Sequence, residues 1–105
     1  MPYSSPAELR EKILEAPLRT TEMRVSAPVI NRNIAALERG APPPRIKVGD
    51  GTIVEGLHWY VAALVLGRQI AFDKTDAPPP ELTRYSMRQV IFEGLDWDNM
   101  TGRRD

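Results

Sequence analysis

Residues 45–72 read RIKVGDGTIVEGLHWYVAALVLGRQIAF, and they contain the clearest secondary-structure signals in the chain. Apolar and basic residues alternate at 45–48, which predicts a short strand. Gly49–Asp50–Gly51 predicts a hairpin turn, because glycine and aspartate tolerate positive φ. Residues 52–55 are rich in β-branched side chains and predict the return strand.

A helix is predicted directly after this hairpin. Gly56 permits a sharp change of direction, and residues 57–66 follow as a segment that is apolar nearly all round. Such a helix is expected in the centre of the fold. Gly67 ends it, and residues 69–72 are predicted to begin a third strand.

Two further helices are predicted before residue 45. Ser5 resembles a helix cap, with proline in the first turn and an acid near the positive end. Pro17 ends this first helix, which directs Leu9, Ile13 and Leu14 inward. The second helix is expected from Asn31 to Arg39, with Ile34 and Leu37 inward and Gly40 just beyond its end. Residues 18–27 between the two helices are predicted to be a loop or a weak strand.

The proline runs 42–44 and 78–80 predict extended connectors, because proline fixes φ and lacks a backbone donor. The chain after them admits two interpretations, a helix over residues 81–92 or a strand over residues 89–95. The acidic end, with Glu93, Asp96 and Asp98 around Trp97, is expected at the surface. Residues 102–105 are expected to fray.

The composition is that of one small globular domain spanning residues 1–105. Hydrophobic residues make up 42% and charged residues 27% of the chain, while cysteine is absent. The absence of cysteine excludes disulfides, thiolate nucleophiles and thiolate zinc sites. A formal net charge of zero argues against a protein that coats DNA. The short apolar run at 61–66 predicts no membrane span, and a cytoplasmic location is expected.

The run from Ile53 to Ala63, followed by Leu66–Gly67–Arg68 and Ile70, is similar to the ParB/sulfiredoxin-like superfamily. In that family a strand ends in an acid and a glycine, and a helix then opens with a Gly-x-His-Arg pattern. The resemblance extends over residues 25–72, since residues 28–34 and 43–48 are similar to the helix lead and the strand that precede this motif. It implies an α+β fold with a short mixed sheet, a central buried helix and flanking helices. A helix N-terminus of this kind directs free amides at a phosphate.

Two departures from the family pattern favour binding over catalysis. Leu57 occupies the position of the catalytic cysteine of the sulfiredoxin branch, which excludes that reductase chemistry. Trp59 stands where an arginine that grips phosphate is usual, and tryptophan offers one N–H and no charge. The resemblance therefore implies a binding module without catalytic residues, whose ligand is a phosphate group, including a nucleotide with Mg²⁺, or a protein surface.

The candidate ligand- or partner-binding residues are Arg32, Arg45, Lys47, Gly56, His58 and Trp59. Four of them also have a structural interpretation: His58 as a helix cap or packing residue, Trp59 as an aromatic at the edge of the core, Gly56 as a turn residue, and Arg32 as a solvated helix residue. Asp96 and Asp98 are weak evidence for a metal site, because two carboxylates lack a third ligand. An immunity or antitoxin protein that inhibits a partner enzyme is the alternative function, and weak DNA binding is the third.

Overall fold

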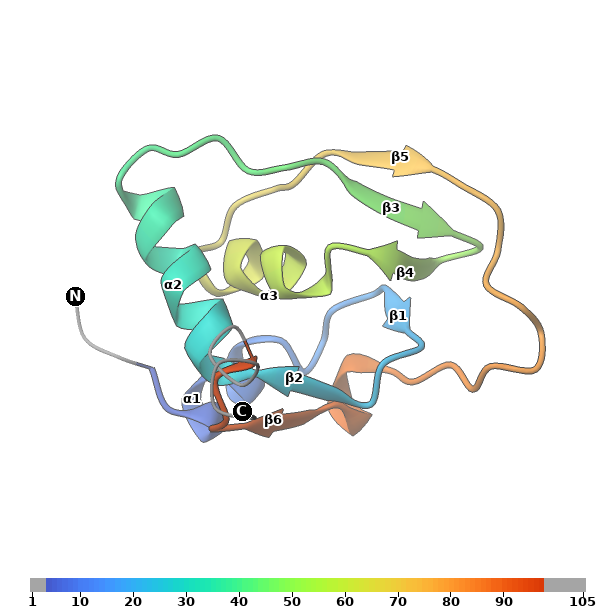
Figure 1. Cartoon of the computed structure of the whole chain (residues 1–105), viewed down its shortest axis with the longest axis horizontal. Helices are drawn as coiled ribbons and strands as arrows, with labels where there is room; N and C mark the ends of the chain where they lie inside the picture. The colour runs from blue at the N-terminus through green and yellow to red at the C-terminus, as the bar shows by residue number, and fades with distance from the viewer. Residues whose placement is uncertain (1–3, 98–105) are drawn as a thin grey trace, which may run out of the picture.

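Asp50 and Gly51 form the two-residue turn of a β-hairpin, with φ angles of 52° and 67°. In the computed structural model, which describes residues 4–97, this turn joins β3 (Ile46–Gly49) to β4 (Thr52–Glu55) (Figure 1). Positive φ at both turn residues matches the twist of the flanking strands. The predicted hairpin is confirmed, with Gly49 in the strand rather than in the turn.

β3 and β4 are the inner strands of a four-stranded mixed sheet in the order β1-β4-β3-β5. β1 (Arg19–Thr20) runs parallel to β4, and β5 (Phe72–Lys74) runs parallel to β3. The predicted start of the third strand at residue 69 is wrong, because the strand begins at Phe72, opposite Ile46. The preceding residues close the end of the central helix instead, where the Arg68 backbone N–H donates to the Ala63 carbonyl.

The central helix α3 (Leu57–Val65) packs against α2 (Ala27–Glu38). Residues 60–63 and Leu57 of α3 are buried, in agreement with its apolar surface. The predicted start of α2 at Asn31 is wrong, because the helix begins at Ala27. Ser26 caps it, and Pro28 lies in the first turn, where the missing N–H loses no helical hydrogen bond.

A second, two-stranded sheet pairs β2 (Arg24–Ser26) with β6 (Ile91–Glu93) in parallel. Residues 18–27 thus contain two short strands, β1 and β2. α1 (Pro6–Lys12) packs against β6 and begins with the predicted serine cap, which forms a reciprocal pair with Glu8. α1 ends at Lys12, and residues 13–15 form a turn before Pro17.

The predicted helix over residues 81–92 is wrong. A short 3-10 helix, η1 (Met87–Gln89), precedes β6, so the alternative of a strand is confirmed over a shorter range. Helical spacing in this segment is overridden by pairing with β2: the Ile91 N–H donates to the Met23 carbonyl, and Phe92 aligns with Val25. Both proline runs lie in stretches without helix or strand, as predicted.

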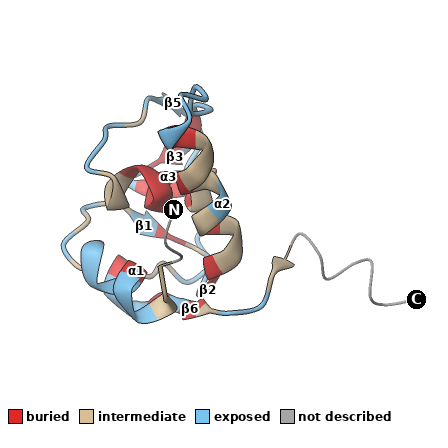
Figure 2. Ribbon diagram, turned by 90° about the vertical axis from the view of Figure 1, so that its left-hand side faces the viewer, coloured by how far each residue is buried: buried red, intermediate tan, exposed pale blue. Residues whose placement is uncertain are grey.

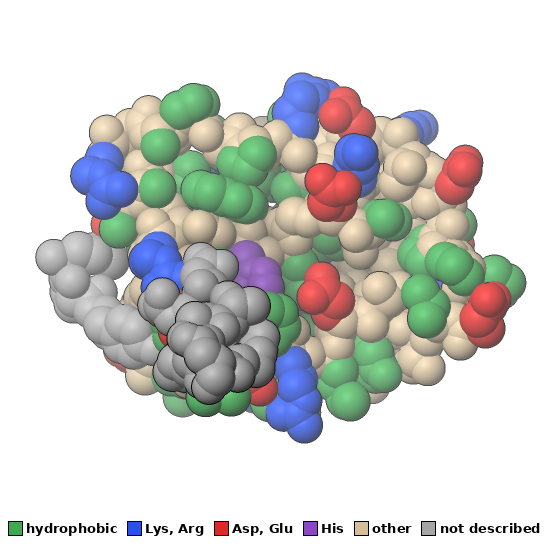
Figure 3. All heavy atoms as spheres, viewed as in Figure 1, with side chains coloured by type: hydrophobic (Ala, Val, Ile, Leu, Met, Phe, Trp, Pro, Cys, Tyr) green, Lys and Arg blue, Asp and Glu red, His purple; other side chains and the backbone are tan. Residues whose placement is uncertain are grey.

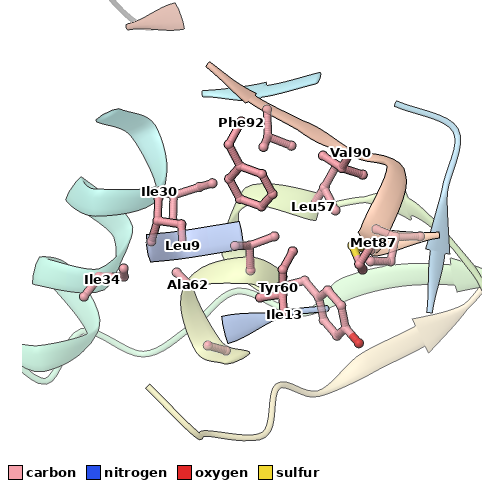
Figure 4. Packing of buried hydrophobic residues seen from close by; sticks show 14 of the residues in the cluster. Leu9, Ile13, Ile30, Ile34, Leu57, Tyr60, Ala62, Met87, Val90 and Phe92 are labelled. Carbon is pink, nitrogen blue, oxygen red and sulfur yellow. The ribbon is translucent and has the colours of Figure 1, made fainter. Parts of the chain in front are cut away.

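One hydrophobic core joins the two sheets and the three helices of the described chain. Buried residues run through α3 and the facing sides of its neighbours (Figure 2). In Figure 4 the side chains of α1, α2, α3 and the C-terminal segment converge: Leu9, Ile13, Ile30, Ile34, Leu57, Tyr60, Ala62, Met87, Val90 and Phe92. This confirms an α+β fold around a buried central helix. Within residues 4–97, no helix has the length and apolar character needed to cross a membrane.

Gly49 lies against the loop that follows β5, and a Cβ added there would be 2.3 Å from the backbone oxygen of Asp76. Because the obstacle is main chain, Gly49→Ala is expected to lower the free energy of unfolding by about 1–3 kcal/mol. Chemical denaturation measures this change. Gly94→Ala is the control, since its Cβ would meet nothing within 4 Å. Equal stability of the two variants would contradict the close packing of this loop.

Candidate functional site

The turn that begins α3 has the backbone geometry that only glycine accepts easily. Gly56 is the N-cap residue with a φ of 98°, and a Cβ added to it would lie 2.5 Å from Cγ2 of Ile46. No side chain caps the helix, and no acid lies in its first turn. The N-terminus of α3 therefore keeps its partial positive charge uncompensated by its own first residues.

His58, in the first turn of α3, is half-buried and binds the start of α2. Its Nε2 accepts a hydrogen bond from the Ser26 backbone N–H at 3.0 Å. An accepting Nε2 carries no proton, so the neutral imidazole in this arrangement is protonated at Nδ1. The ring also contacts the Trp97 ring edge to face, with centroids 5.0 Å apart and planes at 73°.

Arg32, on α2, binds the carboxylate of Asp96 with both terminal nitrogens, at 2.6 and 2.7 Å. This is the bidentate geometry in which a guanidinium recognises carboxylate or phosphate. Because Asp96 and Trp97 are consecutive, Arg32 and His58 flank the same short segment of chain. The structure thus brings together two of the predicted binding residues, from α2 and α3.

Ser26 joins this segment to the body of the protein. Its hydroxyl donates to the Leu95 carbonyl at 2.7 Å and accepts from the Trp97 backbone N–H at 3.4 Å. Ser26 was not among the candidate residues, although serine ahead of a proline is the same helix-start signal that identifies Ser5. The hydrogen bonds of Ser26 with residues 95 and 97 could not be predicted from the local sequence, because these residues lie 69 and 71 positions further along the chain.

The acidic end is only partly the surface segment that its composition predicts. Asp96 and Trp97 are half-buried, while Leu95 is 53% exposed. Glu93 accepts from the Trp97 indole N–H at 2.6 Å and pairs with Arg24 at 3.4 Å. Glu93 and Asp96 pair with Arg24 and Arg32, and Trp97 contacts His58, so residues from distant segments cover part of this end of the chain. Asp98 and residues 102–105 lie outside the described residues.

The ribbon of residues 94–97 runs away from the body of the protein beyond β6 (Figure 2). In Figure 3 the single histidine is visible at the surface of the face that is turned to the viewer. The side chains of Ser26, Arg32 and His58 connect residues 95–97 to the body of the protein.

Arg45 and Lys47 bind acids of the larger sheet instead. Arg45 donates to the Asp73 carboxylate at 2.8 Å and to the Phe72 carbonyl at 3.1 Å. Its hydrogen bond lowers the pKa of Asp73, and the same bond raises the pKa of Arg45. Lys47 pairs with Glu55 at 3.7 Å. Both basic residues therefore have partners other than the segment that Arg32 and His58 flank.

Trp59 is half-buried and packs against the hydrophobic core. It follows His58 in the first turn of α3, and this helical position places it next to the candidate site. In the part of the chain that the structure describes, no group of three or more His, Cys, Asp or Glu side chains could hold a metal ion.

An apolar groove of about 420 Å³ lies elsewhere, between α3 and the edge of the larger sheet. It is lined by residues that include Leu18, Ile46, Tyr60, Leu64 and Phe72. Burial raises the pKa of the Tyr60 hydroxyl, and a hydrogen bond with the Leu18 backbone partly offsets this. The lining carries no paired acid and base, so the groove offers a surface for apolar contact.

No family model, no curated protein and no solved structure matches this chain. The candidate site therefore rests on the geometry of Ser26, Arg32, Gly56 and His58 and on their contacts with residues 95–97.

Proposed function

We propose that this chain is a non-catalytic binding module that recognises an oxyanion through Arg32, next to the N-terminus of α3. The observation that carries the proposal is the bidentate hydrogen bonding of Arg32 to the Asp96 carboxylate. A guanidinium held in this geometry presents two parallel donors, the arrangement that carboxylate and phosphate groups both fit.

Binding is favoured over catalysis by the state of His58. Its Nε2 is engaged with the Ser26 backbone N–H, and its ring lies against Trp97. A general base needs a nitrogen lone pair directed at the substrate proton. In this arrangement the Nε2 lone pair positions the start of α2, which supports a structural and ligand-orienting role for His58.

The proposed oxyanion has two candidate sources, a phosphate-bearing ligand and a carboxylate of a protein partner. A phosphate-bearing ligand, such as a nucleotide with or without Mg²⁺, is favoured by the ParB/sulfiredoxin-like resemblance and by the uncapped first turn of α3. A carboxylate on a protein partner is favoured by Asp96, which already occupies Arg32. The second source includes an immunity-type inhibitor, whose partner enzyme would supply the acid.

A thermal-shift titration of the wild type and Arg32→Ala tests the proposal. The ligands are inorganic phosphate, ATP, CTP, GTP, short DNA and a short acidic peptide, each with and without magnesium. A ligand at about 100 times its Kd stabilises the folded state by roughly 2.7 kcal/mol. We expect at least one ligand to raise the Tm of the wild type by several degrees, and Arg32→Ala to lose that shift.

The matched control is Arg45→Ala, since Arg45 also binds an aspartate but lies on the larger sheet. A shift that survives in Arg32→Ala, or that is lost equally in Arg45→Ala, would contradict a site at Arg32. Turnover of a bound nucleotide that His58→Ala abolishes would contradict the non-catalytic part of the proposal.

A further inference from the structure

Residues 94–97, which we call the C-terminal strap, occupy the surface that the proposed ligand would use. Asp96 takes both terminal nitrogens of Arg32, and Trp97 covers one side of the His58 ring. An incoming oxyanion that binds the two terminal nitrogens of Arg32 needs the donors that Asp96 now takes. Strap and ligand therefore compete for this end of the guanidinium.

The contacts of the strap are those of a segment that can detach. It belongs to neither sheet, and its hydrogen bonds with the rest of the described chain run to the side chains of Ser26, Arg32 and Glu93. The Arg32 side chain remains 46% exposed and that of Asp96 22% exposed. Both side chains of this ion pair reach solvent, and the strap lies at the end of the described chain, so its opening is a local event that does not require the core to unfold.

The residues beneath the strap do not need it for their own packing. Ile30 and Ile34 of α2 and Leu57 of α3 are buried in the core shared with α1 and β6. Ser26 also caps α2 by accepting a hydrogen bond from the Val29 N–H, a bond in which no atom of the strap takes part. Opening therefore removes the contacts of Asp96 with Arg32 and of Trp97 with His58, while this cap and the core remain.

We infer that the C-terminal strap is an internal competing ligand, with the Asp96 carboxylate in place of the oxyanion and Trp97 closing over His58. This inference rests on the proposed function for its biological meaning. It requires that the surface formed by Ser26, Arg32 and His58 recognise an acidic segment with a following aromatic residue. A ligand must then displace the strap, so its apparent affinity is reduced by the fraction of closed molecules.

The test uses the full chain and an unlabelled peptide, Glu-Gly-Leu-Asp-Trp, which repeats residues 93–97. Two-dimensional ¹H–¹⁵N NMR follows its titration into the wild type, Asp96→Asn and Asp96→Asn/Trp97→Ala. We expect the peptide to bind the double variant at least tenfold more tightly than the wild type, with Asp96→Asn between them. Adding Arg32→Ala to the double variant should remove the binding.

The control is Asp73→Asn, which removes an acid paired with Arg45 on the larger sheet and should bind the peptide as weakly as the wild type does. Equal peptide affinities in the wild type and the double variant would overturn the inference. So would the absence of binding to a double variant whose spectrum shows that it is folded. A separate outcome is that the peptide binds as expected while phosphate, nucleotides, DNA and other acidic peptides do not bind. That result would support the inference that the strap is an internal ligand and would contradict the proposed function.

Discussion

Gly56→Ala is expected to lower the free energy of unfolding by roughly 2–5 kcal/mol, the sum of two separate costs. A φ of 98° disfavours any residue with a Cβ, at about 1–2 kcal/mol. The added Cβ would also lie 2.5 Å from Ile46 Cγ2 and 3.0 Å from Ile46 Cβ, and overpacking of this kind costs about 1–3 kcal/mol. Urea denaturation, followed by circular dichroism, measures the loss.

Gly67→Ala separates these two costs. Gly67 follows the opposite end of α3 with a φ of 69°, and a Cβ added there would meet nothing within 4 Å. Its substitution is expected to show the backbone cost of about 1–2 kcal/mol without the clash. If the two alanine variants were equally stable, the close approach of Gly56 to Ile46 would not be a feature of the folded protein.

Met87→Ala is expected to cost about 2–5 kcal/mol of stability, because it leaves a cavity in the core. Met87 is fully buried at the start of η1, although the sequence around it gives no strong structural signal. Val90 and Phe92 are buried beside it, so residues 87–92 complete the core over α1 and α3. Thermal unfolding should show a decrease in Tm of about 10 °C or more.

Leu82→Ala is the matched control for Met87→Ala. Leu82 is the same kind of large apolar residue in the same C-terminal part of the chain, but 47% of it is exposed. Its truncation is expected to change stability by less than about 0.5 kcal/mol, as for most surface positions. A comparable loss in both variants would mean that residues 87–92 are not the core segment that the structure describes.

The fold and the candidate site share residues, and this affects how substitutions there are interpreted. Ser26 caps α2, donates its backbone N–H to His58 and anchors the C-terminal strap through its hydroxyl. Its replacement by alanine removes a helix cap, which costs about 0.5–2 kcal/mol, together with the strap anchor. For this reason Asp96, which belongs to the strap and pairs with Arg32 without capping a helix, is the better residue for testing regulation.

The local signals of the middle of the chain were sufficient for its hairpin and its central helix, though not for the start of the strand that follows. The turn at Asp50–Gly51 and the change of direction at Gly56 depend on φ preferences of single residues, and these act within a few positions. The apolar surface of residues 57–66 correctly predicted that α3 is central. The serine and proline before Glu8 similarly placed the start of α1.

Sequence patterns failed where distant segments pair. Helical spacing at residues 81–92 competed with the pairing of β6 to β2, in which Phe92 lies opposite Val25, and burial of Phe92 favoured the strand. The candidate site shows the same division. Gly56 and His58 could be selected from a motif, whereas Asp96, which is 64 residues from Arg32, could not be assigned to it.

The amino-acid sequence alone therefore determined a cysteine-free α+β fold with a central hairpin and a buried helix, because turns, caps and apolar periodicity are encoded within a few residues. The tertiary structure determined that β2 pairs with β6, that residues 87–92 complete the core, and that Arg32 and His58 meet the C-terminal strap. These contacts join residues far apart in the chain. They depend on how the whole core packs, which no local pattern specifies.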